Sequence, residues 1–286
     1  MKIVIVQDGG LGSLVLMLPA ITDIRAAQPD AEIVLVSRYG ELAVATGAAT
    51  RCPICPLWRG AGPEISVVLA SEIAAADIVL TFISNQRGYE TSFETATKGQ
   101  LIHSGSRPEA GMPAYEFFRK GLSALGIKAG SGAPCIRFPG TVPSERVALC
   151  PTSGVKAKTW AREKWARLLP MIMVDAVLFG YPDNCSPFSI PAPIVLPVHI
   201  EMFKSDSVVE FARKLAACRF WVGHDSGSMH LAAALGLPGV VLRRIPMGGD
   251  LWAPCSPLIE TLPMDATPEM LANVLAGSVG SKGGNE

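Results

Sequence analysis

Short apolar runs alternate along the chain with longer segments of helical periodicity. Lys2–Gln7 has the composition of a buried strand, and Leu11–Gln28 has the pattern of an amphipathic helix that ends before Pro29. The next predicted elements are strands at Glu32–Ser37 and Ala76–Ile83 and a helix, ended by Gly126, at Tyr115–Leu125. Because strands alternate with helices, we expect a mostly parallel sheet covered on both faces.

The alternation is interrupted twice and then resumes. Asn85–Met112 has weak periodicity and is rich in Ser, Thr, Gly and charge, so we expect a long, partly ordered loop there. Phe138–Ser144 is rich in turn formers and predicts a linker between domains. After it, strands are predicted at Arg146–Cys150, Ala176–Gly180, Phe220–Gly223 and Gly239–Leu242, and helices at Thr159–Leu169, Ser207–Ala217, Ser226–Leu235 and Pro268–Ala276. We therefore predict domains at 1–140 and 145–276 and a disordered tail at 277–286.

Composition narrows the functional classes. Hydrophobic residues make up 49% of the 286 residues, which is typical of a globular chain with a large core. The formal net charge is zero, with 25 basic and 25 acidic residues, so no global field attracts a nucleic-acid backbone. The most apolar stretches, Leu14–Ile21 and Leu168–Phe179, are too short and too interrupted to span a bilayer. The chain opens directly on a strand without the pattern of a signal peptide, and we expect it in the cytoplasm.

The seven cysteines are an odd number in a chain without an export signal, so we expect reduced thiols. Cys52-Pro-Ile-Cys55 has a spacing that occurs in zinc sites. A zinc site needs two further ligands at similar spacing, and the sequence has no second pair of that kind. We therefore interpret this segment as a short β-segment with two small apolar side chains and expect no metal.

The most informative local pattern is Val222–Pro238, where a strand ends in a polar turn and an Ala/Leu-rich helix begins. Asp225 is a good N-cap, and a helix start of this kind binds phosphate oxygens through exposed amides. His230 lies one helical turn further on, close enough to donate to a phosphate or a sugar hydroxyl. The alternative is a plain capped helix with a surface histidine. The amides of the predicted anion site belong to Ser226, Gly227 and Ser228.

A second pattern places two lysines, Lys156 and Lys158, just ahead of a helix for which Thr159 is the predicted N-cap. The helix dipole disfavours cations at that end, so their placement is explained if an anion such as a diphosphate lies between them and the amides. The alternative is a pair of solvated lysines.

A third pattern is the glycine-rich turn Asp8–Ser13 between the first strand and the first helix. It is an incomplete dinucleotide fingerprint, because Gly10 and Gly12 are present but the third position is Val15. The second strand is followed by Arg38 and not by the acidic residue that binds an NAD ribose. An NADP-dependent oxidoreductase therefore stays an alternative, and the glycines also serve close packing of helix on strand.

Taken together in their order along the chain, the three patterns resemble glycosyltransferase family 9, the ADP-heptose:lipopolysaccharide heptosyltransferases. Gly12–Pro29, with its internal Pro19-Ala20 pair, looks like the first turn and helix of that family. Lys158-Thr-Trp160 looks like its Lys-x-Trp segment. Gly223–Pro238 is similar to its Asp-Ser/Thr-Gly-x-x-His-x-x-Ala-Ala-x-Gly-x-Pro signature. The resemblance runs through both halves, although the chain is shorter than typical members.

The resemblance implies a fold, a reaction and partners. The fold is GT-B, with two Rossmann-like α/β domains facing each other across a cleft, the acceptor on the N-terminal half and the donor mainly on the C-terminal half. The reaction is an inverting sugar transfer without metal or other cofactor. The donor is a nucleotide sugar, ADP-heptose by family default. The acceptor is a glycan or lipid-linked glycan such as the lipopolysaccharide core, which leaves open a peripheral contact with the cytoplasmic face of the inner membrane.

Carried over by position, the family's donor contacts fall on this chain's own motifs. Lys158 would hold the diphosphate, with Lys156 as a second candidate, and Gly12 would pass near the transferred sugar. The residues that would line the donor pocket are Asp225, Ser226, Gly227 and His230, beside the amide of Ser228.

One departure concerns catalysis. The family usually has an aspartate after the glycine at position 12 that acts as general base, and this chain has Ser13. A serine without an adjacent base is a poor proton acceptor. Asp8 at the same turn is the first substitute, and Glu90 or Glu94 is a second. The third alternative is a protein that binds the donor but catalyses poorly.

A second departure follows the strand that ends at Leu242. The family often has an aromatic-Gly pair there, and this chain has Arg243-Arg244. Two arginines at the carboxyl end of a strand add anion contacts or alter which nucleotide is accepted.

Overall fold

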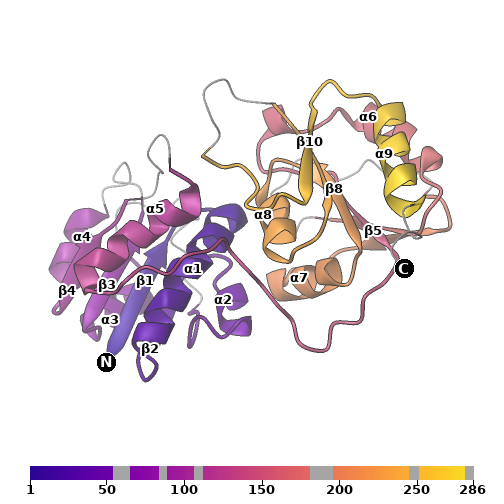
Figure 1. Ribbon diagram of the computed structural model, residues 1–286. Coiled ribbons are helices and arrows are strands. Elements are labelled where there is room, and N and C mark those ends of the chain that lie inside the picture. Colours follow the sequence, from indigo (N-terminus) through magenta and orange to yellow (C-terminus); the bar gives the residue numbers. More distant parts are fainter. Residues whose placement is uncertain (54–64, 84–88, 106–111, 181–195, 245–250, 281–286) are drawn as a thin grey trace. The chain divides into compact units, whose positions relative to one another are not determined.

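The computed structural model describes residues 1–53, 65–83, 89–105, 112–180, 196–244 and 251–280 (Figure 1). The chain divides into two compact units. The first comprises Met1–Ile136 with Gly248–Ala253, and the second comprises Arg137–Met247 with Pro254–Glu286.

The first unit is built on a parallel sheet of four strands in the order β2-β1-β3-β4. The strands are β1 (Lys2–Gln7), β2 (Glu32–Val36), β3 (Ile78–Phe82) and β4 (Gln100–His103). Since β1 leads first to β2 on one side and the chain then returns to β3 on the other, the strand order reverses between β1 and β3. Ligands of open parallel sheets bind at such a reversal, outside the carboxyl ends of the strands.

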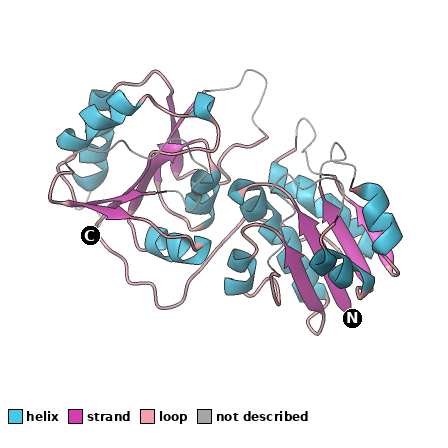
Figure 2. Cartoon of the chain, turned by 180° about the vertical axis from the view of Figure 1, so that it is seen from behind, coloured by secondary structure: helices cyan, strands magenta, loops and turns pink. Residues whose placement is uncertain are grey.

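Helices cover both faces of this sheet (Figure 2). On one face, Val4 and Val6 of β1 pack with Leu69, Ile73 and Phe93 in a continuous core. The other face is covered by the long helix α1, which packs against α5. The helices of this unit are α1 (Leu11–Ala27), α2 (Glu41–Ala45), α3 (Val67–Ala74), α4 (Glu90–Ala96) and α5 (Ala114–Lys120).

The second unit is built on a parallel sheet of six strands in the order β10-β9-β8-β5-β6-β7. The strands are β5 (Val147–Cys150), β6 (Ala176–Phe179), β7 (Ile200–Phe203), β8 (Phe220–His224), β9 (Gly239–Arg243) and β10 (Ile259–Pro263). The order reverses between β5 and β8, which is the Rossmann arrangement, and the reversal marks the expected ligand position.

One face of the second sheet packs under α6 and α9, and the opposite face packs under α7 and α8 (Figure 1). Trp165 and Leu168 of α6 join Leu271 and Leu275 of α9 in the core on the first of these faces. On the other face, Phe211 of α7 contacts Phe179 edge-on at 5.0 Å between ring centroids. The helices are α6 (Arg162–Leu168), α7 (Val208–Ala216), α8 (Gly227–Ala234) and α9 (Pro268–Gly280).

Most of the predicted strands and helices are confirmed to within two residues at each end, and three predictions are wrong. The expected loop Asn85–Met112 contains the helix α4 and the parallel strand β4. The helix expected from Thr159 begins only at Arg162. The tail expected at 277–286 begins inside α9, which continues to Gly280, and residues 281–286 lie outside the described residues.

Several further features bear on the sequence predictions. The helix predicted at Tyr115–Leu125 is α5 followed by the 3₁₀-helix Gly121–Leu125, and Gly126 ends it in the left-handed region at φ 67°.

Of the two cysteines in the segment Cys52-Pro-Ile-Cys55, Cys52 is half-buried and Cys55 lies outside the described residues. Within the described residues, no helix is both long and apolar enough to cross a membrane.

Candidate functional site

Three neighbouring strands of the second sheet end at the same edge, and the residues that follow them form the candidate site. β5 and β9 both pair with β8, so their carboxyl ends lie on either side of its own. The segment Pro151–Lys158 follows β5, Asp225–Ser228 follows β8, and Arg243 is the last residue of β9. Because the strand order reverses between β5 and β8, this edge is where a parallel sheet binds its ligand.

Two cations flank one carboxylate at this edge. Lys158 Nζ lies 2.9 Å from Asp225 Oδ2, and Arg243 Nη2 lies 3.8 Å from the same oxygen. The Lys158 side chain is 46% exposed, whereas those of Asp225 and Arg243 are 15% and 6% exposed. The structure thus brings together the predicted residues Lys158 and Asp225, and it adds Arg243 to them.

The start of α8 differs from the prediction in its cap. Ser226, with an extended backbone, occupies the N-cap, and its side chain makes no capping hydrogen bond. Asp225 was predicted as the N-cap, and that prediction is wrong because its carboxylate is paired with Lys158. The Oγ atoms of Ser226 and Ser228 are hydrogen-bonded to each other at 2.9 Å. The first amides of a helix have no acceptor further back in the helix, and they carry the positive end of its dipole. In α8 the Met229 amide donates to the Ser226 carbonyl at 3.1 Å.

His230 lies one turn into α8 and is buried, with 5% of its surface exposed. The alternative of a surface histidine is therefore wrong. Burial lowers the pKa of His230 to about 4, with the Asp225 carboxylate opposing the shift and the Arg243 and Lys158 cations adding to it. The imidazole is consequently neutral at physiological pH.

His224, the last residue of β8, was not predicted as a site residue. It is fully buried, and its Nε2 accepts the backbone N–H of Trp160 at 2.9 Å. The Trp165 ring packs edge-on against it with 5.6 Å between centroids. Burial lowers the pKa of His224 to about 4, so the ring is neutral, and the hydrogen bond from Trp160 requires Nε2 to be its unprotonated nitrogen. His224 therefore ties the lysine-bearing loop after β5 to β8, the strand that ends just before Asp225.

The lysines lie on a short 3₁₀-helix, η3 (Lys156–Lys158), and not directly ahead of α6. Thr159 was predicted as the N-cap of α6, but its Oγ1 donates backwards to the Lys156 carbonyl at 2.7 Å, and Ala161 is the N-cap. Lys156 is exposed. Ser153 is buried, and its hydroxyl lies 3.4 Å from the Asp225 carbonyl oxygen, so a second contact joins the two loops.

In the first unit, the predicted residues Asp8, Gly12 and Ser13 lie at the carboxyl end of β1, where that sheet reverses its order. α1 begins at Leu11 with Gly10 as its N-cap, so Gly12 and Ser13 belong to the first helical turn. Asp8 is half-buried.

The turn is tight at Gly9. A Cβ atom at Gly9 would collide with the Gln7 side-chain nitrogen and lie 2.8 Å from Ser13 Oγ. The Gln7 side chain in turn accepts the Ser37 hydroxyl at 2.7 Å. Of the other candidate bases, Glu94 is exposed on α4, and the side chain of Glu90 lies outside the described residues.

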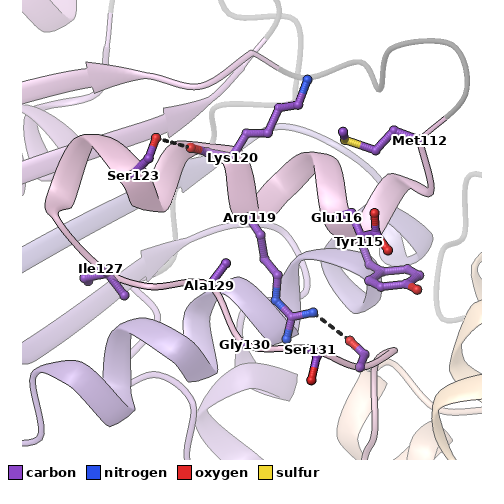
Figure 3. A pocket seen from close by; sticks show the side chains of 11 residues that line it. Met112, Tyr115, Glu116, Arg119, Lys120, Ser123, Ile127, Ala129, Gly130 and Ser131 are labelled. Carbon is purple, nitrogen blue, oxygen red and sulfur yellow. Dashed lines mark hydrogen bonds between the residues drawn. The ribbon is translucent and has the colours of Figure 1, made fainter.

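The first unit also has a pocket of about 660 Å³ beside α5 (Figure 3). Arg119 lines it and is held by Asp23 at 2.8 Å and by the Gly132 carbonyl at 2.7 Å. The backbone N–H of Gly130 donates to Asp23 at 3.0 Å, which fixes the other wall of the pocket. Its lining residues include none of the predicted site residues.

Comparison with known proteins bears on the second unit directly. Residues 196–244, which run through β7, α7, β8, α8 and β9, match the sequence model of glycosyltransferase family 9 (heptosyltransferase). The predicted resemblance to family 9 is confirmed. The matched segment contains Asp225, His230 and Arg243, whereas Lys158 and the turn at Asp8–Ser13 lie outside it.

Solved structures of heptosyltransferases are similar to the chain over nearly its whole length. E. coli heptosyltransferase WaaC with ADP has a TM-score of 0.65 and 18% identity, covering 97% of this chain and 98% of that one. The same enzyme with ADP-2-deoxy-2-fluoro heptose has a TM-score of 0.63 and 18% identity, covering 97% and 100%. E. coli ADP-heptose lipopolysaccharide heptosyltransferase II has a TM-score of 0.71 and 16% identity, covering 98% of both chains.

These similarities concern the fold. The predicted α/β, GT-B class is confirmed, since two parallel α/β units of four and six strands match the heptosyltransferase structures. A search of curated protein sequences gives no match.

Proposed function

We propose that the chain is a glycosyltransferase of the family 9 type, which takes a sugar from a nucleoside-diphosphate donor bound in its second unit. The observation that carries the proposal is the convergence of Lys158, Asp225 and Arg243 beside the start of α8, at the point where the sheet reverses its order. A helix start, a lysine and a buried arginine together favour a ligand with several negative charges. A diphosphate meets that requirement.

The sugar donor is proposed from the relatives. The E. coli structures similar to this chain include one with ADP and one with ADP-2-deoxy-2-fluoro heptose. We therefore propose ADP-heptose as the donor, and a glycan such as the lipopolysaccharide core as the acceptor. The transfer inverts the anomeric centre and requires no bound metal.

The chemistry assigns different tasks to the charged groups. As the glycosidic bond breaks, the anomeric carbon gains positive charge and the diphosphate gains negative charge. Lys158 and the amides of Ser226–Ser228 stabilise the leaving diphosphate, with exposed Lys156 as a second cation. The neutral imidazole of His230 is suited to a hydrogen bond with the donor and adds no charge of its own.

Proton removal from the acceptor hydroxyl requires a base, and we propose Asp8. It lies at the same turn as Ser13, at the carboxyl end of β1, and a carboxylate is a far better proton acceptor than a serine hydroxyl. Ser13 packs its hydroxyl against Gly9 near the Gln7 amide, so it contributes a neutral polar group to this turn.

The presence of Ser13 where the family pattern has an aspartate favours a second candidate function. If Asp8 does not reach the acceptor, the Ser13 hydroxyl is a poor proton acceptor in its place, and the protein binds a nucleotide sugar without efficient transfer. The two candidates share the donor site and differ only in the first unit.

A two-step experiment tests the proposal. A thermal-shift panel of ADP-, GDP- and UDP-sugars identifies the donor, because a ligand that binds the native state raises its melting temperature. Incubation of the protein with the best donor and lipopolysaccharide-core acceptors, followed by mass spectrometry, then detects transfer. Binding with product formation supports the transferase. Binding without product, together with activity gained in Ser13→Asp, supports the second candidate. Absence of binding to every nucleotide sugar overturns both.

A further inference from the structure

We infer that Arg243 is a positioning residue that keeps Asp225 neutralised and in place when Lys158 turns from Asp225 to the donor diphosphate. The inference rests on the proposed function, because it presupposes that a nucleoside diphosphate binds at this edge of the second sheet. It assigns a role to an arginine that stands where the family pattern has an aromatic-Gly pair.

Both cations, Lys158 and Arg243, lie close to the same carboxylate oxygen of Asp225. Lys158 Nζ is at hydrogen-bonding distance, 2.9 Å, from Asp225 Oδ2, and Arg243 Nη2 is one step further, at 3.8 Å. Asp225 thus has one close cationic partner and a second cation already in position. Only a small displacement turns the longer contact into a direct hydrogen bond.

The two cations differ in their freedom to move. Lys158 sits on a short 3₁₀-helix in a loop, and its side chain is 46% exposed, so its ammonium group can turn towards a ligand. Arg243 ends the buried strand β9, and its side chain is 6% exposed. The lysine is therefore the group that leaves Asp225, and the arginine is the group that stays.

Asp225 needs such a partner for two physical reasons. A carboxylate with only 15% of its side chain exposed is destabilised when its close cation is removed. An incoming diphosphate is also repelled by an unpaired carboxylate at the same edge. Arg243 prevents both the destabilisation of the carboxylate and its repulsion of the diphosphate, since its charge stays beside Asp225 whichever way Lys158 points. The neighbouring His230 imidazole is neutral and supplies no charge for this purpose.

Arg244 provides a matched control. It is the next residue in the chain and carries the same side chain, but it is exposed. Successive residues of an extended segment point in opposite directions, so Arg243 and Arg244 cannot both face Asp225.

The test is calorimetric titration with ADP of wild type and of three variants, Arg243→Met, Arg243→Lys and Arg244→Met. We expect Arg243→Met to weaken ADP binding about tenfold, Arg243→Lys to remain within about threefold of wild type, and Arg244→Met to stay within about twofold. Circular dichroism and thermal unfolding verify that each variant is folded. Arg243→Lys keeps a cation, so it separates loss of charge from loss of packing if Arg243→Met does not fold.

A double-mutant cycle with Asp225→Asn separates positioning from direct contact with the phosphates. If Arg243 acts through Asp225, Arg243→Met has less than about a twofold effect on ADP affinity in the Asp225→Asn background. An undiminished tenfold loss in that background, or equal effects of Arg243→Met and Arg244→Met, overturns the inference while the donor site stands. Failure of wild type to bind ADP or any other nucleoside diphosphate overturns the proposed function and this inference with it.

Discussion

The two units place the same local architecture, a strand-to-helix turn at a reversal of strand order, in very different chemical surroundings. The turn from β1 to α1 contains the neutral groups of Gln7, Gly9 and Ser13 packed on one another, with Asp8 as its acidic residue. The turn from β8 to α8 carries a carboxylate flanked by two cations. Under the proposed function, backbone topology decides where a ligand binds in each unit, and the side chains after the strands decide which charge the ligand has.

The contrast supports a division of labour between the units. An anionic leaving group is stabilised by fixed positive charge, which the second turn provides through Lys158 and the amides of α8. Deprotonation of a neutral hydroxyl needs a carboxylate, and Asp8 is the carboxylate of the first turn.

The largest effect is expected from Asp8→Asn in the first turn. Loss of a general base costs about 10²- to 10⁴-fold in kcat, because the amide is isosteric but does not accept the proton. We expect donor affinity to change by less than about twofold, since the donor is proposed to bind in the second unit. Steady-state kinetics and ADP titration measure the two quantities separately. Full turnover in this variant would remove Asp8 from the mechanism.

The next effect is expected from Lys158→Ala in the second turn. Removing a cation that stabilises developing charge lowers kcat/KM by about 10²-fold. Here ADP affinity should fall together with turnover, in contrast to Asp8→Asn. Lys98→Ala, which removes an exposed lysine of the first unit, is the control. Kinetics indistinguishable from the control would contradict the diphosphate role of Lys158.

A smaller effect on stability is expected from alanine at Gly223 and at Gly9, one tight glycine beside each turn. At Gly223, a Cβ atom would lie 2.8 Å from the backbone oxygen of Cys150 and 2.6 Å from the Trp221 ring, on strands that cannot shift freely. At Gly9, the nearest atoms belong to the side chains of Gln7 and Ser13, which can partly rearrange. We expect destabilisation of about 3 kcal/mol for Gly223→Ala and about 1 kcal/mol for Gly9→Ala.

Thermal unfolding of both variants measures the difference, with about 2–4 °C expected for each kcal/mol. The reverse order of the two melting temperatures would show that the first turn is the more rigid one.

The central strands and the main helices could be predicted from the sequence because they are buried, and burial requires continuous apolar runs. β4, β7 and β10 could not be predicted in the same way. They lie at the edges of the two sheets, and exposed positions such as Glu201 and Met202 interrupt their apolar pattern. Their identity as strands depends on the neighbours they pair with, which a local pattern does not contain.

Within the candidate site, local chemistry could be predicted and long-range pairing could not. Asp225 and Thr159 are both good N-cap residues by type, yet each is used otherwise. Lys158 binds the Asp225 carboxylate, which lies 67 positions away in the sequence. His224 accepts the amide hydrogen of Trp160, which lies 64 positions away. Only the order of β5 and β8 in the sheet brings these partners together.

A further effect on stability concerns pH, and it again separates the two turns, because buried histidines lie beside the second. Burial lowers the pKa of His224 and of His230 from 6.5 to about 4. Between these values the unfolded chain binds protons that the folded chain does not, so stability is full above about pH 6.5 and falls as pH drops towards about 4. Each histidine contributes at most about 1.4 kcal/mol per pH unit in that window. Urea unfolding at pH 7, 6 and 5 should show this decline in wild type and a shallower one in His230→Gln. Equal declines in the two proteins would mean that the acid sensitivity comes from groups other than His230.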